Sequence, residues 1–166
     1  MFFRIKKVKG KEYAYLVENE WGKKGSRQRV KGYIGRAYRF NLNDNIEFMQ
    51  FKNIQDIGKY VDDNSFRKII CDLVEWELSR HNVDRNMFSV DLDVMKVRQN
   101  KKKAVMIIND GFFCDNTLSN LVNLKLNNNE EEGYLFARAF VEAGIKVPQE
   151  IFVALFGKLY KTGHQL

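Results

Sequence analysis

The chain of 166 residues has few of the residue types that build metal centres, disulfide frameworks or membrane spans. It holds two cysteines, Cys71 and Cys114, and two histidines, His81 and His164, and none of the four stands at the short paired spacing of zinc sites. Two unpaired cysteines are typical of reduced thiols in a cytosolic protein. No apolar run approaches the roughly 20 residues that cross a bilayer, and the first residues lack the unbroken apolar stretch of a signal peptide. The composition therefore predicts a soluble, cytoplasmic protein.

Motifs of catalysis are equally scarce. No glycine pattern follows a strand in the manner of a phosphate-binding loop. Asp91 and Asp93 alternate along a predicted strand and could hold a divalent cation there, but their spacing lacks a third ligand. We expect no cofactor and no enzymatic activity. A metal-dependent nuclease that uses Asp91 and Asp93 is kept as an alternative.

The first forty residues predict a meander of short strands joined by glycine-bearing turns. Tyr13 and Tyr15 alternate with small and apolar residues, and this period of two is that of a β-strand. Lys9-Gly10 and the loop Gly22–Gly25 provide the glycines that tight hairpin turns need where φ becomes positive. In the strand that follows, Val30 and Ile34 are predicted on one face. The opposite face is predicted to carry Arg27, Arg29, Lys31 and Tyr33.

Lysine and arginine are concentrated in this meander. Residues 1–40 contain 12 Lys or Arg against three acids, a net charge of +9, whereas the whole chain carries +7 and residues 41–166 therefore sum to −2. Cations displace condensed counterions from phosphates, and aromatic rings among them stack on bases, so this composition favours a nucleic-acid-binding face. The alternative is a solvated sheet whose lysines protect exposed strands from aggregation.

Two runs of the meander, KGKEYAYLVEN and RQRVKGYIGR, lie within residues 9–36. Their marks are Lys9-Gly10, Tyr13-Ala14-Tyr15-Leu16, Arg27-Gln28-Arg29 and Tyr33-Ile34-Gly35. This segment resembles the N-terminal β segment that precedes the catalytic domain in some insertion-element transposases and that occurs in small archaeal or bacterial proteins. The resemblance implies a relation to mobile elements and contact with DNA. It does not imply transposition, because the rest of the chain is too short for an acidic-triad nuclease domain and shows no such triad.

The remaining pattern predicts an α+β fold in one compact unit. We expect a basic β-meander module over residues 1–42, an α+β core over 43–126 and a helical hairpin over 127–166. In the core, the sequence predicts a strand at 46–51, a helix from Asn53 through Tyr60, and a β-hairpin made of strands 87–97 and 104–110. A further helix is predicted after Asn109-Asp110-Gly111, with Asp115 or Asn116 as its cap.

The most regular helix pattern covers residues 65–81, where we expect Asn64 to be the cap. Arg67, Asp72, Glu75 and Ser79 are predicted on the outer side. Its apolar stripe, spaced by three and four residues, consists of Phe66, Ile69, Ile70, Leu73, Val74 and Leu78. This amphipathic helix is therefore predicted to pack on the hairpin.

The C-terminal part predicts two helices, with Gly144 as the left-handed cap of the first and Pro148 in the first turn of the second. The second helix presents mainly apolar side chains, whereas a helix that reads DNA needs polar ones at the base edges. We therefore expect a core hairpin or a homodimer contact through residues 130–160.

These observations favour a non-enzymatic nucleic-acid-binding protein, with DNA preferred to RNA as its partner. The alternative is a protein-interaction or dimerisation module that binds no nucleic acid. No membrane partner is expected. The predicted phosphate and base contacts are Lys9, Lys11, Trp21, Lys23, Lys24, Arg27, Arg29, Lys31, Tyr33 and Arg36.

Overall fold

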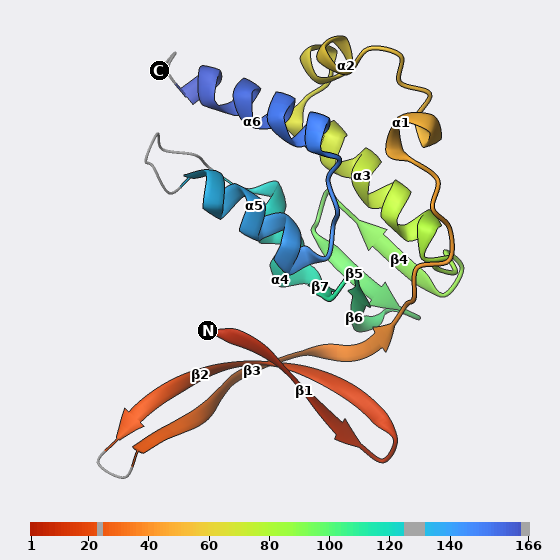
Figure 1. Ribbon diagram of the computed structural model, residues 1–166. Helices are drawn as coiled ribbons and strands as arrows, with labels where there is room; N and C mark the ends of the chain where they lie inside the picture. The colour runs from red at the N-terminus through yellow and green to blue at the C-terminus, as the bar shows by residue number, and fades with distance from the viewer. Residues whose placement is uncertain (23–24, 125–131, 164–166) are drawn as a thin grey trace.

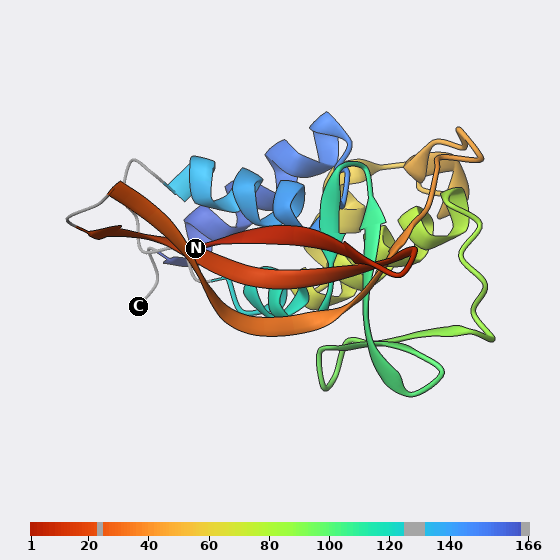
Figure 2. The same cartoon turned by 90° about the horizontal axis from the view of Figure 1, so that it is seen from below.

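The computed structural model describes residues 1–22, 25–124 and 132–163 and has the predicted α+β fold (Figure 1). The strands are β1 (Phe2–Val8), β2 (Lys11–Gly22), β3 (Gly25–Arg39), β4 (Phe88–Asp91), β5 (Lys96–Gln99), β6 (Lys102–Ile108) and β7 (Gly111–Phe113). The helices are α1 (Phe48–Phe51), α2 (Ile57–Asp63), α3 (Phe66–Arg80), α4 (Asp115–Val122), α5 (Glu132–Ala143) and α6 (Gln149–Gly163). The helices and β4–β7 form a body, and the meander of β1–β3 lies along one side of it (Figures 1 and 2).

The N-terminal meander is confirmed. β1 pairs with β2 and β2 pairs with β3, both antiparallel. Lys9 and Gly10 both have positive φ, +47° and +75°, which is the backbone of a two-residue hairpin turn. The turn predicted at Gly22–Gly25 is flanked by a Gly22–Gly25 cross-strand pair, while Lys23 and Lys24 lie outside the described residues.

A parallel strand pair joins the meander to the body. Arg36–Arg39 of β3 runs beside Ala104–Ile107 of β6. The strand order is β1-β2-β3-β6-β5-β4, and β7 pairs with the C-terminal half of β6. Strand β6 therefore fixes the position of the meander relative to the helices.

The main core lies between β4–β7 and all six helices. A smaller cluster fixes the meander to the body: Phe3 of β1 stacks on Phe112 of β7 with ring centroids 5.0 Å apart. Its members are Phe3, Ile5, Ala14, Ile34, Ala37, Val105, Ile107, Phe112 and Cys114. One face of the meander is thus covered by the body, and the other face points away from it.

The helix predicted over 65–81 is confirmed as α3, but two details differ. Its cap is Ser65, whose hydroxyl accepts the Lys68 N–H at 3.2 Å, whereas the Asn64 amide donates to the Tyr60 carbonyl at 2.7 Å. Asp72, predicted on the outer side, is buried. It is buried because three donors from α2, α3 and the segment between α1 and α2 converge on its carboxylate.

The strand predicted at 46–51 is wrong, because these residues form an irregular segment and the short helix α1. The Phe48 ring lies 5.5 Å from that of Trp76, and the Trp76 indole donates to the Ile46 carbonyl at 2.8 Å. These contacts with α3 select the helix. The next helix begins after Asp56 and not at Asn53, since Asp56 caps the Lys59 N–H at 2.9 Å.

The single strand predicted over 87–97 is interrupted. Asp91 Oδ1 accepts the N–H groups of Asp93 and Val94 at 2.9 and 3.1 Å, and Met95 has a φ of +52°. The side chain of Asp91 thereby closes a turn. Two short strands, β4 and β5, result, and β5 forms a second hairpin with β6.

The C-terminal helical hairpin is confirmed within the described residues, and the boundary predicted at residue 127 lies outside them. Gly144 has a φ of +71° after α5, and Pro148 immediately precedes α6. A Cβ at Gly111 would stand 2.2 Å from the Gly144 nitrogen, so β7 and the end of α5 meet backbone to backbone. The cap of α4 is Cys114, not Asp115 or Asn116.

Candidate nucleic-acid interface

Cross-strand pairing divides the meander into two faces of different chemistry. Successive side chains of β2 point to opposite faces of the sheet. The residue that pairs with each of them on β1 or β3 points to the same face as its β2 partner. We call the face that contains Tyr13 and Tyr15 the tyrosine face. Its residues are Phe2, Arg4, Lys6, Val8, Lys11, Tyr13, Tyr15, Val17, Asn19, Trp21, Ser26, Gln28, Val30, Tyr33 and Arg36. The face opposite contains Ala14 and packs on the body.

Two β-bulges in β3 determine which cations reach the tyrosine face. Tyr15 pairs with Tyr33, and Val17 pairs with Val30, so Ile34 and Lys31 are extra residues on β3. Beyond the bulges, Arg29 pairs with Glu18 and Arg27 with Glu20, on the face opposite the tyrosines. The prediction that Arg27, Arg29, Lys31 and Tyr33 share one face is therefore wrong. So is the prediction that Val30 and Ile34 share the other, since Ile34 packs on the body and Val30 lies on the tyrosine face.

Three tyrosine rings form the centre of the tyrosine face. The Tyr33 ring centroid lies 5.5 Å from that of Tyr15 and 6.4 Å from that of Tyr13, both at tilted angles. Tyr33 is 50% exposed, and partial burial raises its pKa above the usual value. The Lys6 ammonium lies 5.1 Å from the Tyr15 ring centroid. Such a cation–π contact keeps the positive charge on the aromatic surface.

Further cations border these rings. The Arg36 guanidinium lies 4.8 Å from the ring centroid of Tyr38. Arg4 of β1 donates to the Gln28 side chain of β3 and so crosses over β2. Lys11 lies on the same face beside the Lys9-Gly10 turn. Arg4 and Lys6 were absent from the predicted contacts, although the alternation of apolar and basic residues in β1 signals both.

All three acids of the meander lie on the opposite face. Glu12 binds Arg39 at 2.8 Å, Glu18 binds Lys31, and Glu20 binds Arg29 at 2.9 Å. The bond to Glu20 raises the pKa of Arg29. Two predicted phosphate contacts, Arg29 and Lys31, are thus paired with carboxylates. In the described part of the meander, the cations without an acidic partner are Arg4, Lys6, Lys7, Lys9, Lys11, Arg27 and Arg36.

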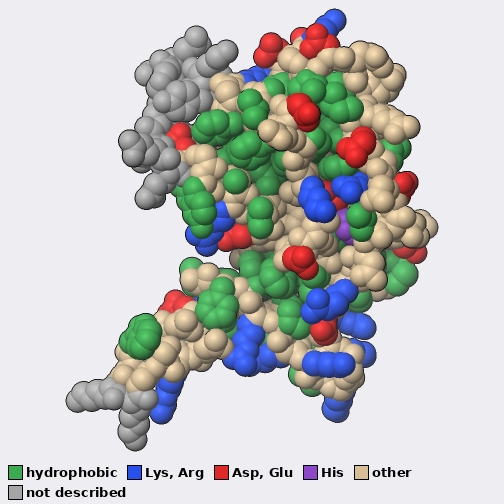
Figure 3. All heavy atoms as spheres, in the orientation of Figure 1, with side chains coloured by type: hydrophobic (Ala, Val, Ile, Leu, Met, Phe, Trp, Pro, Cys, Tyr) green, Lys and Arg blue, Asp and Glu red, His purple; other side chains and the backbone are tan. Residues whose placement is uncertain are grey.

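The end of the meander projects from the molecule as a two-stranded arm. We define the arm as residues 18–22 of β2 and 25–29 of β3, which extend past the last pair with β1 at Val17 (Figure 1). Trp21 on this arm is 84% exposed. Lys and Arg side chains mark the lower part of the molecule, over the meander, in Figure 3. The major groove of B-DNA admits a two-stranded β-ribbon of this kind.

The residues considered for metal binding have other contacts. Asp91 accepts turn N–H groups, and Asp93 binds Arg67 at 3.0 Å. Both cysteines are free thiols, and burial raises the pKa of Cys114. His81 lies buried beside the Glu77 carbonyl, and His164 lies outside the described residues. Over residues 1–22, 25–124 and 132–163, no three His, Cys, Asp or Glu side chains come together as a cation site.

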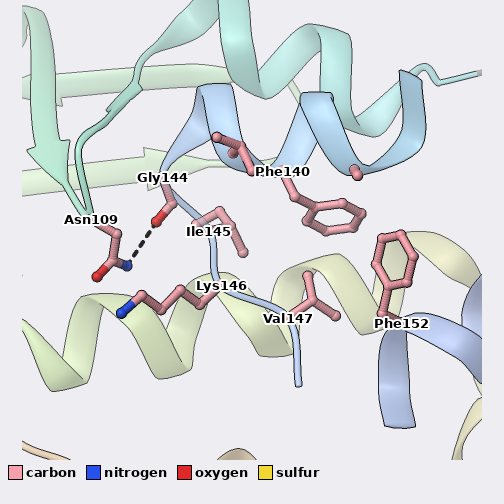
Figure 4. Close-up of a pocket in the computed structure, with 9 residues that line it drawn as sticks. Asn109, Phe140, Gly144, Ile145, Lys146, Val147 and Phe152 are labelled. Carbon is pink, nitrogen blue, oxygen red and sulfur yellow. Dashed lines mark hydrogen bonds between the residues drawn. The ribbon is translucent and has the colours of Figure 1, made fainter. Parts of the chain in front are cut away.

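A pocket of about 440 Å³ opens between α5, α6 and the link that joins them (Figure 4). Its walls are mainly apolar, with Phe140, Ile145 and Phe152 among them. The Asn109 amide at its edge donates to the Gly144 carbonyl and to the Glu77 carboxylate, each at 2.9 Å. Its donors are therefore committed to the fold, and this pocket offers few polar groups to a ligand.

The outer side of α5 carries exposed apolar side chains within the predicted dimer segment 130–160. Tyr134, Leu135 and Val141 are exposed there.

Among the described helices, none combines the length and apolar character required to cross a membrane. In comparisons with known proteins, no family model, no curated protein sequence and no solved structure matches this chain.

Proposed function

We propose that this protein binds nucleic acid through the N-terminal meander and catalyses no reaction. The observation that carries the proposal is the separation of charge on the meander: the tyrosine face bears Arg4, Lys6, Lys11 and Arg36, and the acids lie on the other face. Phosphates can approach these cations without meeting a carboxylate of the meander. Lys9, in the turn between β1 and β2, extends this positive surface at one end, whereas Arg27 adds a positive charge to the opposite face of the arm.

Phosphate contacts of this kind give affinity without base preference. We propose DNA before RNA as the partner, in line with the resemblance of residues 9–36 to transposase β segments. A cytoplasmic location is part of the proposal and agrees with the two free thiols. The arm adds Trp21 as an exposed ring on the same face as these cations.

Salt dependence tests the proposal. Each phosphate contact contributes about −0.9 to the slope of log K against log salt for duplex DNA and about −0.7 for single strands. The triple variant Arg4→Gln, Lys6→Gln, Arg36→Gln should reduce the steepness of this slope by about 2 to 3 and weaken binding at least about tenfold near 0.1 M salt. The matched control Lys59→Gln, Arg85→Gln, Lys146→Gln removes three exposed cations from the body.

The control should bind as the unmodified protein does. Equal losses in the two triple variants would show that net charge matters and the meander does not, which contradicts the proposed interface. Binding that is flat between low and physiological salt would exclude phosphate contacts altogether. DNA and RNA oligonucleotides of one sequence, titrated in parallel, decide which of them is preferred.

The exposed apolar side chains of α5 favour a second candidate, a homodimer contact. Tyr134 and Val141 lie two turns apart on one side of the helix, and both are exposed. Sedimentation velocity over a range of concentrations tests this candidate. A dimer should dissociate in the variant Tyr134→Ser, Val141→Ser, whereas a monomer at every concentration of the unmodified protein would exclude it.

A further inference from the structure

The tyrosine face combines two kinds of group that bind different parts of a nucleotide. Rings stack on bases, and cations bind phosphates. Tyr33 is the most exposed of the three central rings, and it leans against Tyr15 and Tyr13 with centroids 5.5 and 6.4 Å away. Lys6 already lies over the Tyr15 ring at 5.1 Å. Tyr33 is therefore the ring on this face with the most free surface for a base.

Cations lie on the two outer strands of this face. Lys6 and Arg4 come from β1, and Arg36 comes from β3 on the far side of β2. Lys6, Tyr13 and Arg36 stand opposite one another on β1, β2 and β3, and Tyr33 lies beside this row on β3. A chain that crosses the face along this row meets a cation, then tyrosine rings, then a second cation. That order matches a single nucleotide strand, in which a charged backbone alternates with exposed base surfaces.

A duplex does not fit this arrangement. Its bases are stacked on one another, so it presents base edges and phosphates but no free ring surface to Tyr33. The width of the sheet also opposes groove binding. Three strands spaced about 4.8 Å apart span about 10 Å between the outer strand axes, before side chains are added. This exceeds the minor groove of about 6 Å and leaves no room in a major groove of about 12 Å.

We propose that the tyrosine face binds single-stranded nucleic acid, with Tyr33 stacking on a base while Lys6 and Arg36 bind the flanking phosphates. Tyr13 and Tyr15 hold the Tyr33 ring in place. This inference rests on the proposed function, because it names the form of nucleic acid that the meander takes. It assigns the narrower arm no part in the stacking.

Three probes of equal length test the inference on the unmodified protein. They are a fluorescein-labelled thymidine oligonucleotide of about 12 nucleotides, which lies within the known range of single-strand sites, an abasic strand with the same phosphates, and a duplex. Binding is measured by fluorescence anisotropy near 0.1 M salt. The thymidine strand should bind at least about tenfold more tightly than the abasic strand, because only the former can stack. The duplex should bind no better than the abasic strand.

Variants of Tyr33 test the residue itself. Tyr33→Ala should weaken binding of the thymidine strand about tenfold and leave the abasic strand unchanged. Tyr33→Phe keeps the ring and should stay within about twofold of the unmodified protein. Met87→Ala, which removes an exposed apolar side chain just before β4 and outside both proposed surfaces, is the control and should also stay within about twofold. Thermal melting of each variant checks that its fold is retained.

The outcomes separate the two proposals. If all three probes bind equally, phosphate binding stands and the single-strand inference is wrong. The single-strand inference is also wrong if Tyr33→Ala weakens binding of the abasic strand and the thymidine strand alike. If none of the probes binds, the proposed function fails together with the inference.

Discussion

Glu77 accepts a hydrogen bond from the Asn109 side-chain amide at 2.9 Å and thereby joins the middle of the body to the turn between β6 and β7. The same buried carboxylate accepts the Lys146 backbone N–H at 3.0 Å, and Arg80 lies 3.5 Å from it. One side chain of α3 thus fixes the β6–β7 turn and the link between α5 and α6. His81, 3.3 Å away, completes the surroundings of the carboxylate.

We predict that Glu77→Gln lowers the free energy of unfolding by about 1–3 kcal/mol. Glutamine has an NH2 group in place of one acceptor oxygen. This NH2 group faces either the Asn109 amide or the Lys146 N–H, and that buried donor is left without an acceptor. Glu75→Gln, on the exposed side of the same helix, should cost less than about 1 kcal/mol. Urea unfolding measures both variants. Equal losses in the two would contradict the role given to Glu77.

Asp72 should make stability depend on pH in the acid range. Burial alone would raise the pKa of Asp72, but hydrogen bonds from Lys52, Lys68 and Tyr60 outweigh it and lower the pKa. A carboxyl whose folded pKa lies below its unfolded value of about 3.9 stabilises the fold fully above that pH. Its contribution is lost as the pH falls through the folded pKa.

The free energy of unfolding of the unmodified protein should therefore fall between about pH 4 and the folded pKa of Asp72. Asp72→Asn should be less stable at neutral pH and should show a smaller fall in acid. Asp62→Asn, an exposed carboxylate on α2, should follow the unmodified protein. Denaturant unfolding at a series of pH values gives the comparison, and parallel curves for Asp72→Asn and the unmodified protein would exclude this coupling.

Lys158 of α6 caps the C-terminal end of α2. Its ammonium donates to the carbonyls of Val61, Asp62 and Asn64 at 2.6, 3.1 and 2.7 Å. We predict that Lys158→Met lowers the free energy of unfolding by about 1–3 kcal/mol and exposes the amides of α2 to faster hydrogen exchange, because the helix end loses its cationic donor. Lys59→Met, an exposed position on α2, serves as control. Unchanged exchange in α2 would show that Lys158 is dispensable there.

The acids of the arm should restrain binding. Glu18 pairs with Lys31 and Glu20 with Arg29 on the face opposite the tyrosines, so removing both acids frees two cations and opens a second phosphate-binding surface there. The double variant Glu18→Gln, Glu20→Gln should bind oligonucleotides several-fold more tightly, with a salt slope steeper by up to about 2. The control Glu75→Gln, Glu142→Gln makes the same charge change by releasing ion-paired cations of the body. Identical gains in both variants would assign the effect to net charge.

Local signals in the sequence were sufficient for the meander and for α3. Alternation and the Lys9-Gly10 turn are encoded over a few residues, and the stripe of α3 repeats over four turns. The burial of Asp72 could not be predicted from local signals of this kind. Only Lys68 stands at a helical spacing from it, while Lys52 and Tyr60 reach it through the tertiary fold.

The candidate site was predicted in composition but not in geometry. The sequence places cations and tyrosines in one segment, yet a regular alternation continues through Lys31 and Ile34, where the pairing in fact shifts. A bulge carries no reliable local signature, so the reassignment of Arg29 to the opposite face required the register. The alternation in β1 puts Arg4 and Lys6 on one face, but only the pairing of β1 with β2 brings them beside the tyrosines.

The two extra residues also make β3 longer than the stretch of β2 that it accompanies. A bulge bends its strand and increases the local twist. Removing Lys31 and Ile34 would leave the remaining partners opposite one another and produce a straighter ladder. The direction of the arm relative to the helices therefore depends on the number of residues in β3. Insertions and deletions in β3 would change this direction, whereas substitutions would not.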